Sequence, residues 1–127
     1  MEPEVLVSCA CETGEGPLWH HAEQRVYWVD VPVVGSAGRI HRFDPATGQH
    51  EIVVEGIGIT NGLGFSPDRE QLYYTDTTQR AIYVFDYDEA TGALANQRVA
   101  VRTPTSPDEG LPDGMTGVWS RNRMPAP

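Results

Sequence analysis

An internal repeat constrains the fold of this chain more than any other feature of its sequence. An apolar and aromatic segment that ends in aspartate occurs at Val26–Asp30 and again at Leu72–Asp76. Each copy is preceded by a polar residue that stands directly before a glycine, Glu15 in the first copy and Asn61 in the second. The separations from Glu15 to Asn61 and from Asp30 to Asp76 are both 46 residues. Because short strands that recur every 40 to 50 residues or so are typical of propeller blades, the repeat predicts a β-propeller architecture.

Each copy of the repeat divides into four short strands. The predicted strands are Pro17–Trp19, Arg25–Asp30, Arg39–Asp44 and His50–Val54 in the first copy, and Leu63–Ser66, Gln71–Thr75, Ala81–Tyr87 and Gln97–Arg102 in the second. A third copy begins at Asp113, 52 residues after Asn61, and then stops. We therefore expect an all-β fold in one domain, residues 1–127: a partial β-propeller of about two four-stranded blades plus the start of a third. Blade one is expected over residues 16–55, blade two over 63–102 and the third start over 113–119.

Three oxygen-bearing residues occupy the same place in the three copies: Glu15, Asn61 and Asp113. Propeller blades surround a central channel, and we place the first strand of each blade against it. The three side chains would then converge near one axis, where carboxylate and amide oxygens suit a hard divalent cation. The alternative is that acidic and amide residues before glycine are ordinary turn formers. Their placement at one point of three repeats favours the ligand interpretation.

The repeated motifs give the chain a resemblance to a known family. Gly14–Trp19, Tyr27–Asp30, Ile59–Asp68 and Leu111–Thr116 resemble motifs of the SMP-30/gluconolactonase/regucalcin family, whose members are six-bladed propellers. The resemblance implies that Glu15, Asn61 and Asp113 match the three metal ligands of that family. It also implies hydrolysis of a sugar-type lactone with one bound divalent cation. Calcium is the expected cation, and zinc, magnesium and manganese are the alternatives.

The resemblance and general chemistry together suggest a mechanism. A bound ion would polarise the lactone carbonyl and acidify a coordinated water molecule. Asp113 is the expected general base, and Glu15 and Asn61 are expected to act as ligands only. The sequence has no Gly-x-Ser-x-Gly element, so it gives no support to a serine esterase mechanism.

The chain departs from the family pattern in two places. In the family, a long segment that carries substrate contacts separates the first blade from the Thr-Asn-Gly motif, whereas here only Gln49–Gly58 lie between. The last blades of the family also have no counterpart after Thr116. A second hypothesis therefore stays open: a non-catalytic metal-binding propeller fragment, or a subunit of an assembly. Because uncovered blade faces promote association, we expect self-association.

The charge of the chain excludes some partners. Nine basic residues stand against eighteen acidic ones, so the formal net charge is −9. This charge opposes nucleic-acid backbones and anionic membrane surfaces and favours metal ions. The sequence has no run long enough for a transmembrane helix, and Met1–Glu4 is acidic where a signal peptide would be basic. We expect a cytoplasmic protein.

Three further expectations concern the N-terminal apolar run, the cysteines and the histidines. The apolar run Val5–Ala10 predicts a strand. Cys9 and Cys11, the only cysteines, are expected to be unpaired thiols. The histidines are expected at the solvated surface because spacing identifies no partner for any of them; they are His20, His21, His41 and His50.

Overall fold

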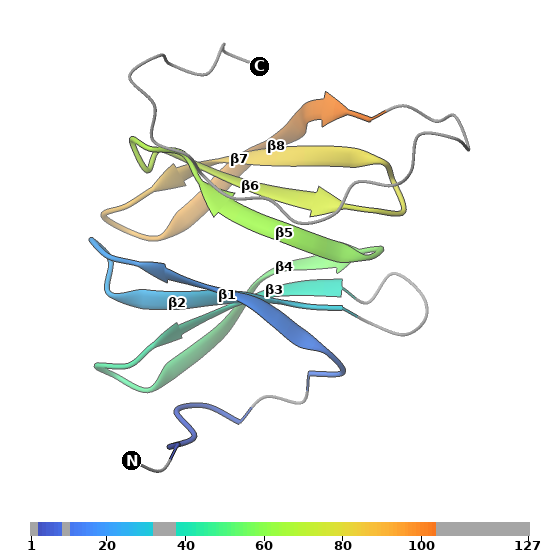
Figure 1. Ribbon diagram of the computed structural model, residues 1–127. Helices are drawn as coiled ribbons and strands as arrows, with labels where there is room; N and C mark the ends of the chain where they lie inside the picture. The colour runs from blue at the N-terminus through green and yellow to red at the C-terminus, as the bar shows by residue number, and fades with distance from the viewer. Residues whose placement is uncertain (1–2, 9–10, 32–37, 104–127) are drawn as a thin grey trace.

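The computed structural model describes residues 3–8, 11–31 and 38–103. The strands of this part of the chain are β1 (Gly14–His20), β2 (Arg25–Asp30), β3 (Gly38–Asp44), β4 (Gln49–Ile57), β5 (Thr60–Phe65), β6 (Gln71–Asp76), β7 (Ala81–Asp88) and β8 (Ala93–Arg102). They form two four-stranded antiparallel sheets with the strand orders β1-β2-β3-β4 and β5-β6-β7-β8 (Figure 1). Each sheet is a propeller blade, with its first strand at one edge and its fourth strand at the other. The predicted all-β partial propeller is confirmed, and the expected start of a third blade lies outside the described residues.

The last strand of blade two is longer than the sequence predicts. β8 begins at Ala93, four residues before the predicted Gln97. Its pairing with β7 contains an irregularity between Val84 and Asp86, and Asn96 has a φ of 54°. An extra residue in a left-handed conformation is a β-bulge, through which pairing continues. The sequence pattern breaks at the bulge although the strand does not.

The strand predicted at Val5–Ala10 is not found in the part of this segment that the structure describes. Residues 3–8 pair with no described strand, and the side chains of Val5 and Leu6 are 80% and 65% exposed. A strand needs a neighbour to take up its backbone hydrogen bonds, so an apolar run without one does not form a strand.

The first strands of the two blades share the same backbone irregularity. Glu15 pairs with Val29, and Asn61 pairs with Thr75, immediately before a register shift in each strand. A glycine follows in both cases, and the two glycines have φ values of 63° and 70°. Glycine adopts this conformation without the steric cost of a Cβ atom. The repeat therefore extends from the sequence to the local backbone geometry.

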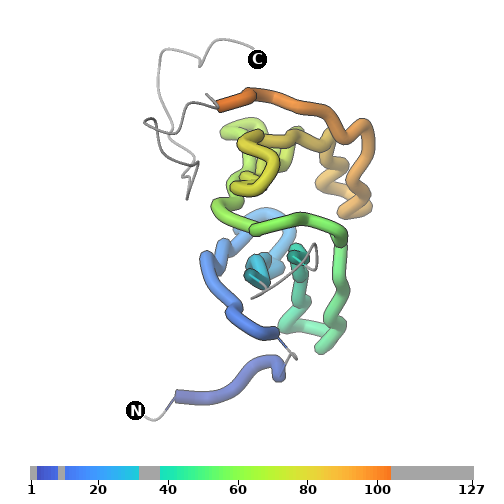
Figure 2. Tube along the Cα trace, turned by 90° about the vertical axis from the view of Figure 1, so that its right-hand side faces the viewer, coloured from blue at the N-terminus to red at the C-terminus, as the bar shows by residue number. Residues whose placement is uncertain are grey.

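The two blades pack face to face and share one apolar core (Figures 1 and 2). β5 is the strand of blade two that contacts β1, β2 and β3 of blade one. The buried members of the core are Tyr27, Val29, Ile40, Val54 and Ile57 from blade one and Leu63, Leu72, Tyr74 and Phe85 from blade two. Burial of apolar surface between the sheets is therefore the main attraction that joins the blades.

Aromatic rings meet at the blade junction. The ring of Phe65 lies edge-on to His20 at 4.6 Å, to Tyr27 at 5.1 Å and to Tyr87 at 4.9 Å, measured between centroids. The hydroxyl groups of Tyr27 and Tyr87 lie 3.2 Å apart. Edge-to-face pairs of this kind add to the stabilisation that burial alone provides.

A buried arginine also joins the two blades. Nη1 of Arg42 in β3 donates to the carbonyl oxygen of Gly92 in the β7–β8 turn at 2.7 Å. Its Nε donates to Oε2 of Glu51 at 2.9 Å, and the Arg42 side chain is 10% exposed. Because both contacts hold a buried charge, Arg42 is a charged link between the blades, beside the hydroxyl contact of Tyr27 and Tyr87.

The expectation that the histidines lie at the solvated surface is wrong for His20 and His41, each of which is 3% exposed. Nδ1 of His20 accepts a hydrogen bond from the backbone N–H of Glu23 at 3.0 Å. Burial lowers the pKa of His20 below its usual 6.5. Blade two covers His20, and spacing within one repeat cannot reveal such cover.

Candidate metal centre

The two predicted ligands that the structure describes occupy equivalent positions. Glu15 and Asn61 are each the second residue of the first strand of a blade, and each pairs with the residue before the final aspartate of the second strand. β1 and β5 contact each other and begin at the same end of the molecule, on the right in Figure 1. Asp113, the third predicted ligand, lies outside the described residues.

The polar atoms of these two side chains suit a hard cation. The Nδ2 group of Asn61 donates to Oγ1 of Thr77 at 3.3 Å, which leaves the Oδ1 oxygen as the atom that a cation can use. Glu15 has an exposed carboxylate. One charged and one neutral oxygen are the ligand types that calcium and magnesium select.

Asp76 supports the strand that carries Asn61. Its carboxylate accepts hydrogen bonds from the N–H of Gly58 at 3.0 Å and from the N–H and hydroxyl of Thr78 at 3.1 and 2.7 Å. Burial alone would raise the pKa of Asp76, but these hydrogen bonds outweigh it and the pKa lies below 3.8. The ionised carboxylate therefore fixes the β4–β5 connection against the turn after β6.

A second group of polar side chains lies on blade one. The rings of Trp28, His41 and His50 are stacked with centroid separations of 5.1 to 5.4 Å. Nδ1 of His41 lies 2.8 Å from Nε2 of His50, and Nε2 of His41 lies 3.7 Å from Sγ of Cys11. One donor atom each from Cys11, Asp30 and His41 lie within 4.8 Å of one another.

Two expectations from the sequence are wrong for residues of this group. Cys11 is disulfide-bonded, so the expectation of unpaired thiols is wrong for it; Cys9 lies outside the described residues. His41 was expected at the surface and is buried. A signal was present, because repeat alignment places His41 opposite Tyr83, and a histidine at an aromatic position of the repeat marks a change of chemistry.

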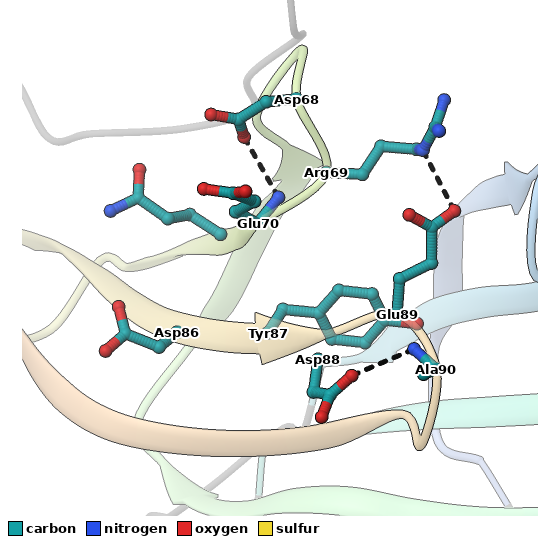
Figure 3. Close-up of a pocket in the computed structure, with 9 residues that line it drawn as sticks. Asp68, Arg69, Glu70, Asp86, Tyr87, Asp88, Glu89 and Ala90 are labelled. Carbon is teal, nitrogen blue, oxygen red and sulfur yellow. Dashed lines mark hydrogen bonds and ion pairs between the residues drawn. The ribbon is translucent and has the colours of Figure 1, made fainter.

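An acidic groove lies at the other end of blade two, at the β5–β6 and β7–β8 turns. Figure 3 shows Arg69 paired with Glu89 at 3.0 Å, while Asp68 and Asp88 accept backbone N–H groups within their own turns at 2.9 Å. These hydrogen bonds account for both aspartates as turn formers. The groove is lined by residues 68–71 and 86–90, so it contains neither Glu15 nor Asn61.

Within the described residues, no helix has the length and apolar character needed to span a membrane.

The sequence is similar to a known family and to characterised lactonases. The sequence model of the SMP-30/gluconolactonase/LRE-like region matches residues 13–53 and 33–117. A pentonolactonase of Haloferax volcanii is 29% identical over 204 residues, which cover 91% of this chain and 68% of that protein. A 6-deoxy-6-sulfogluconolactonase of Pseudomonas putida is 32% identical over 94% of this chain and 35% of its own length. The first alignment exceeds the 127 residues of this chain, so it crosses a long segment of the relative that has no counterpart here.

Solved structures show the same fold. A luciferin-regenerating enzyme superposes with a TM-score of 0.65 and 26% identity over 72% of this chain and 32% of its own. A calcium-binding regucalcin of Agrobacterium tumefaciens superposes with a TM-score of 0.68 and 21% identity over 81% of this chain and 34% of its own. The chain thus spans about a third of these propellers. From its family match and its two blades, the chain belongs to the SMP-30/gluconolactonase/LRE-like family.

Proposed function

We propose that this chain supplies the ligands of a divalent-metal centre that hydrolyses a sugar-type lactone. The observation that carries the proposal is the equivalence of Glu15 and Asn61: both lie beside a bulge glycine on the first strand of a blade. Asp113 is the proposed third ligand. Calcium is the proposed ion, and zinc, magnesium and manganese are the alternatives.

The residues have different roles in this proposal. A bound divalent cation would act as a Lewis acid toward the lactone carbonyl and lower the pKa of a water molecule. Glu15 supplies negative charge, and Asn61 supplies a neutral oxygen whose direction Thr77 helps to set. Asp113 is proposed as the general base that takes the proton of the attacking water.

The lactone substrate class comes from the relatives. The names pentonolactonase and 6-deoxy-6-sulfogluconolactonase describe hydrolases of sugar-type lactones. A second candidate function, metal binding without catalysis, is favoured by the long segment of the pentonolactonase that this chain does not match. Substrate orientation can account for several kcal/mol of barrier lowering, so loss of orienting contacts lowers the rate by orders of magnitude.

Proton release from lactones in the presence of each metal tests the two functions. We expect slow, chelator-sensitive hydrolysis that is lost in Asn61→Ala, Glu15→Gln and Asp113→Ala. Glu55→Gln is the matched control, because Glu55 is an exposed glutamate on β4, the strand farthest from β1 in the same blade. Metal binding without any hydrolysis would support the second function, and hydrolysis that survives all three site substitutions would contradict the first.

We also propose self-association. The outermost strands β4 and β8 expose Ile52 (40%), Val99 (39%) and Val101 (49%), and exposed apolar side chains on sheet edges favour contact between chains. Sedimentation should give a mass above the 14.0 kDa of one chain. A compact monomer at micromolar concentration would contradict this proposal.

A further inference from the structure

The polar group of blade one lies on the face that points away from blade two. Tyr27 and Val29 of β2 belong to the core shared by the blades. Side chains alternate along a strand, so Trp28 and Asp30 point to the opposite face. Trp28 pairs directly with His41 across the β2–β3 ladder. This face therefore holds a buried histidine and a buried aspartate, and burial of such groups is favourable only when polar partners satisfy them.

The geometry of this group matches a transition-metal site. Sγ of Cys11 lies 3.7 Å from Nε2 of His41. A tetrahedral zinc ion with ordinary bond lengths to sulfur and nitrogen separates those two ligand atoms by about 3.6 Å. A carboxylate oxygen of Asp30 lies within 4.8 Å of Sγ of Cys11 and of a ring nitrogen of His41, which provides a third ligand. Three protein ligands of these types leave one position of a zinc ion for water.

His50 orients the histidine ligand. Nδ1 of His41 and Nε2 of His50 lie 2.8 Å apart, and their rings are stacked. When the Nδ1–H of His41 donates to His50, the lone pair of its other ring nitrogen points toward Cys11. A hydrogen bond to the second ring nitrogen is the usual support of a metal-binding histidine.

Among the residues that the structure describes, fewer backbone groups use the carboxylate of Asp30 than use that of its repeat counterpart, Asp76. Asp76 accepts the N–H of Thr78, two residues later in the chain. The residue two positions after Asp30 is Pro32, which has no N–H to donate. Oδ1 of Asp30 accepts the N–H of Thr13 at 3.0 Å. The carboxylate of Asp30 is thus less committed to turn formation than that of Asp76.

We propose that reduction of the Cys11 disulfide creates a zinc site formed by Cys11, Asp30 and His41. In the structure Cys11 is disulfide-bonded, and a disulfide sulfur carries no negative charge for a metal ion. A dithiol reductant supplies two electrons and two protons: its own sulfurs join in a disulfide, and the protein disulfide becomes two thiols. Zinc then replaces the thiol proton of Cys11, and the proton passes to solvent.

This site differs in chemistry from the all-oxygen centre proposed for Glu15 and Asn61. Thiolate and imidazole ligands select zinc and cobalt over calcium, whereas carboxylate and amide oxygens accept calcium. Zinc binding at Cys11 should therefore persist in a Glu15→Gln/Asn61→Ala background and should not be displaced by calcium. Failure of the lactonase proposal would leave this prediction unchanged.

The test uses the Glu15→Gln/Asn61→Ala background and measures zinc affinity by competition with a chromophoric chelator. It compares oxidised protein with protein that has been reduced anaerobically and separated from the dithiol. We expect about one zinc ion per chain after reduction and none before it. Cys9→Ser removes the only other cysteine of the sequence, so this variant should bind zinc without a reductant. Cys11→Ser is its matched control and should not bind. Cobalt should give a thiolate charge-transfer absorption in Cys9→Ser and none in Cys11→Ser.

Two substitutions to phenylalanine distinguish the proposed metal ligand, His41, from the residue that orients it, His50. His41→Phe keeps the stack with Trp28 and removes the ligand nitrogen, so zinc binding should be lost. His50→Phe removes only the supporting hydrogen bond, so affinity should fall about tenfold. A cooperative thermal transition in each variant verifies folding. The proposal would be overturned by equal zinc affinity in oxidised and reduced protein, or by no binding after reduction. It would also be overturned if Cys9→Ser and Cys11→Ser bound zinc equally, or if His41→Phe bound zinc as tightly as its parent.

Discussion

Blade one and blade two have the same backbone plan and different chemistry at matching positions. The bulge at the first strand, the strand order and the aspartate that ends the second strand occur in both. Trp28 and His41 of blade one correspond to Tyr74 and Tyr83 of blade two, and both pairs are stacked, at 5.1 and 5.2 Å. The backbone repeat thus determines where a side chain lies, and the individual residue determines what it can do there.

Packing accounts for the difference between the two pairs. Tyr74 is part of the core shared with blade one, and Tyr83 packs against that core. Trp28 and His41 lie on the face of blade one that points away from blade two. A position that packs against a second apolar sheet favours aromatic residues, whereas the other face can retain polar groups when they satisfy one another.

The largest effect is expected at the charged link between the blades. Arg42 corresponds in the repeat to Val84, and it reaches across to the Gly92 carbonyl. Arg42→Met removes the cation beside the buried Glu23 carboxylate and the donor to the Gly92 carbonyl, so we expect a loss of about 3 kcal/mol in the free energy of unfolding. Urea denaturation measures it. Arg98→Met removes an exposed ion pair with Asp86 and should cost much less than Arg42→Met; equal losses would contradict a special role for Arg42.

The next largest loss of stability is expected at Asp76, which corresponds to Asp30 in the repeat. Asp76→Asn should lower stability by about 2 kcal/mol because charged hydrogen bonds to Gly58 and Thr78 are lost. Asp30→Asn, measured without added metal, should cost less than half as much. The pKa of Asp76 lies below 3.8 in the folded chain, so its contribution is present above about pH 4 and is lost as pH falls through the folded pKa. Acid titration of stability should lack this loss in Asp76→Asn, and equal costs for both aspartates would contradict the comparison.

A smaller loss of stability is expected at Gly16 and Gly62, the glycines at the bulges of β1 and β5. Gly16→Ala and Gly62→Ala place a Cβ atom at φ values of 63° and 70°, so each should cost about 1 kcal/mol. A Cβ atom at Gly16 would lie 3.9 Å from Val29, so the cost comes from conformation and not from a clash. Thermal denaturation of both variants should show similar losses. A neutral effect in one blade alone would show that the two bulges are not equivalent.

The smallest effect concerns His20, which lies at the blade junction. Its pKa is below 6.5 in the folded chain because of burial, so the unfolded chain binds more protons between the folded pKa and 6.5. Stability should therefore fall as pH decreases from about 7, and it should level off below the folded pKa. In His20→Gln this part of the pH dependence should be absent. An identical pH profile in the variant would exclude His20 as its source.

The sequence predicts the repeated parts of the fold better than the contacts between repeats. The 46-residue offset places Glu15 opposite Asn61 and Asp30 opposite Asp76, as the strand pairing does. The bulge at Asn96 is not predictable from alternation, because an extra residue shifts the pattern without ending the strand.

Burial of polar residues is the part that the sequence does not reveal. His20 is buried because it packs on Phe65 of the other blade. Cys11 and His41 come together across 30 residues of chain. The first contact depends on how the two sheets pack, and the second on how the segment before β1 lies against blade one. Periodicity within one strand encodes neither.

The proposed metal centre requires that Glu15 and Asn61 bind one and the same divalent cation. Calcium titration calorimetry of the parent, Glu15→Gln, Asn61→Ala and the double variant measures this shared binding. We expect each single substitution to weaken binding and their effects to be non-additive, because both side chains contact one ion in the proposed centre. Unchanged affinity in Asn61→Ala, which leaves the net charge as it is, or strictly additive effects in the double variant would contradict it.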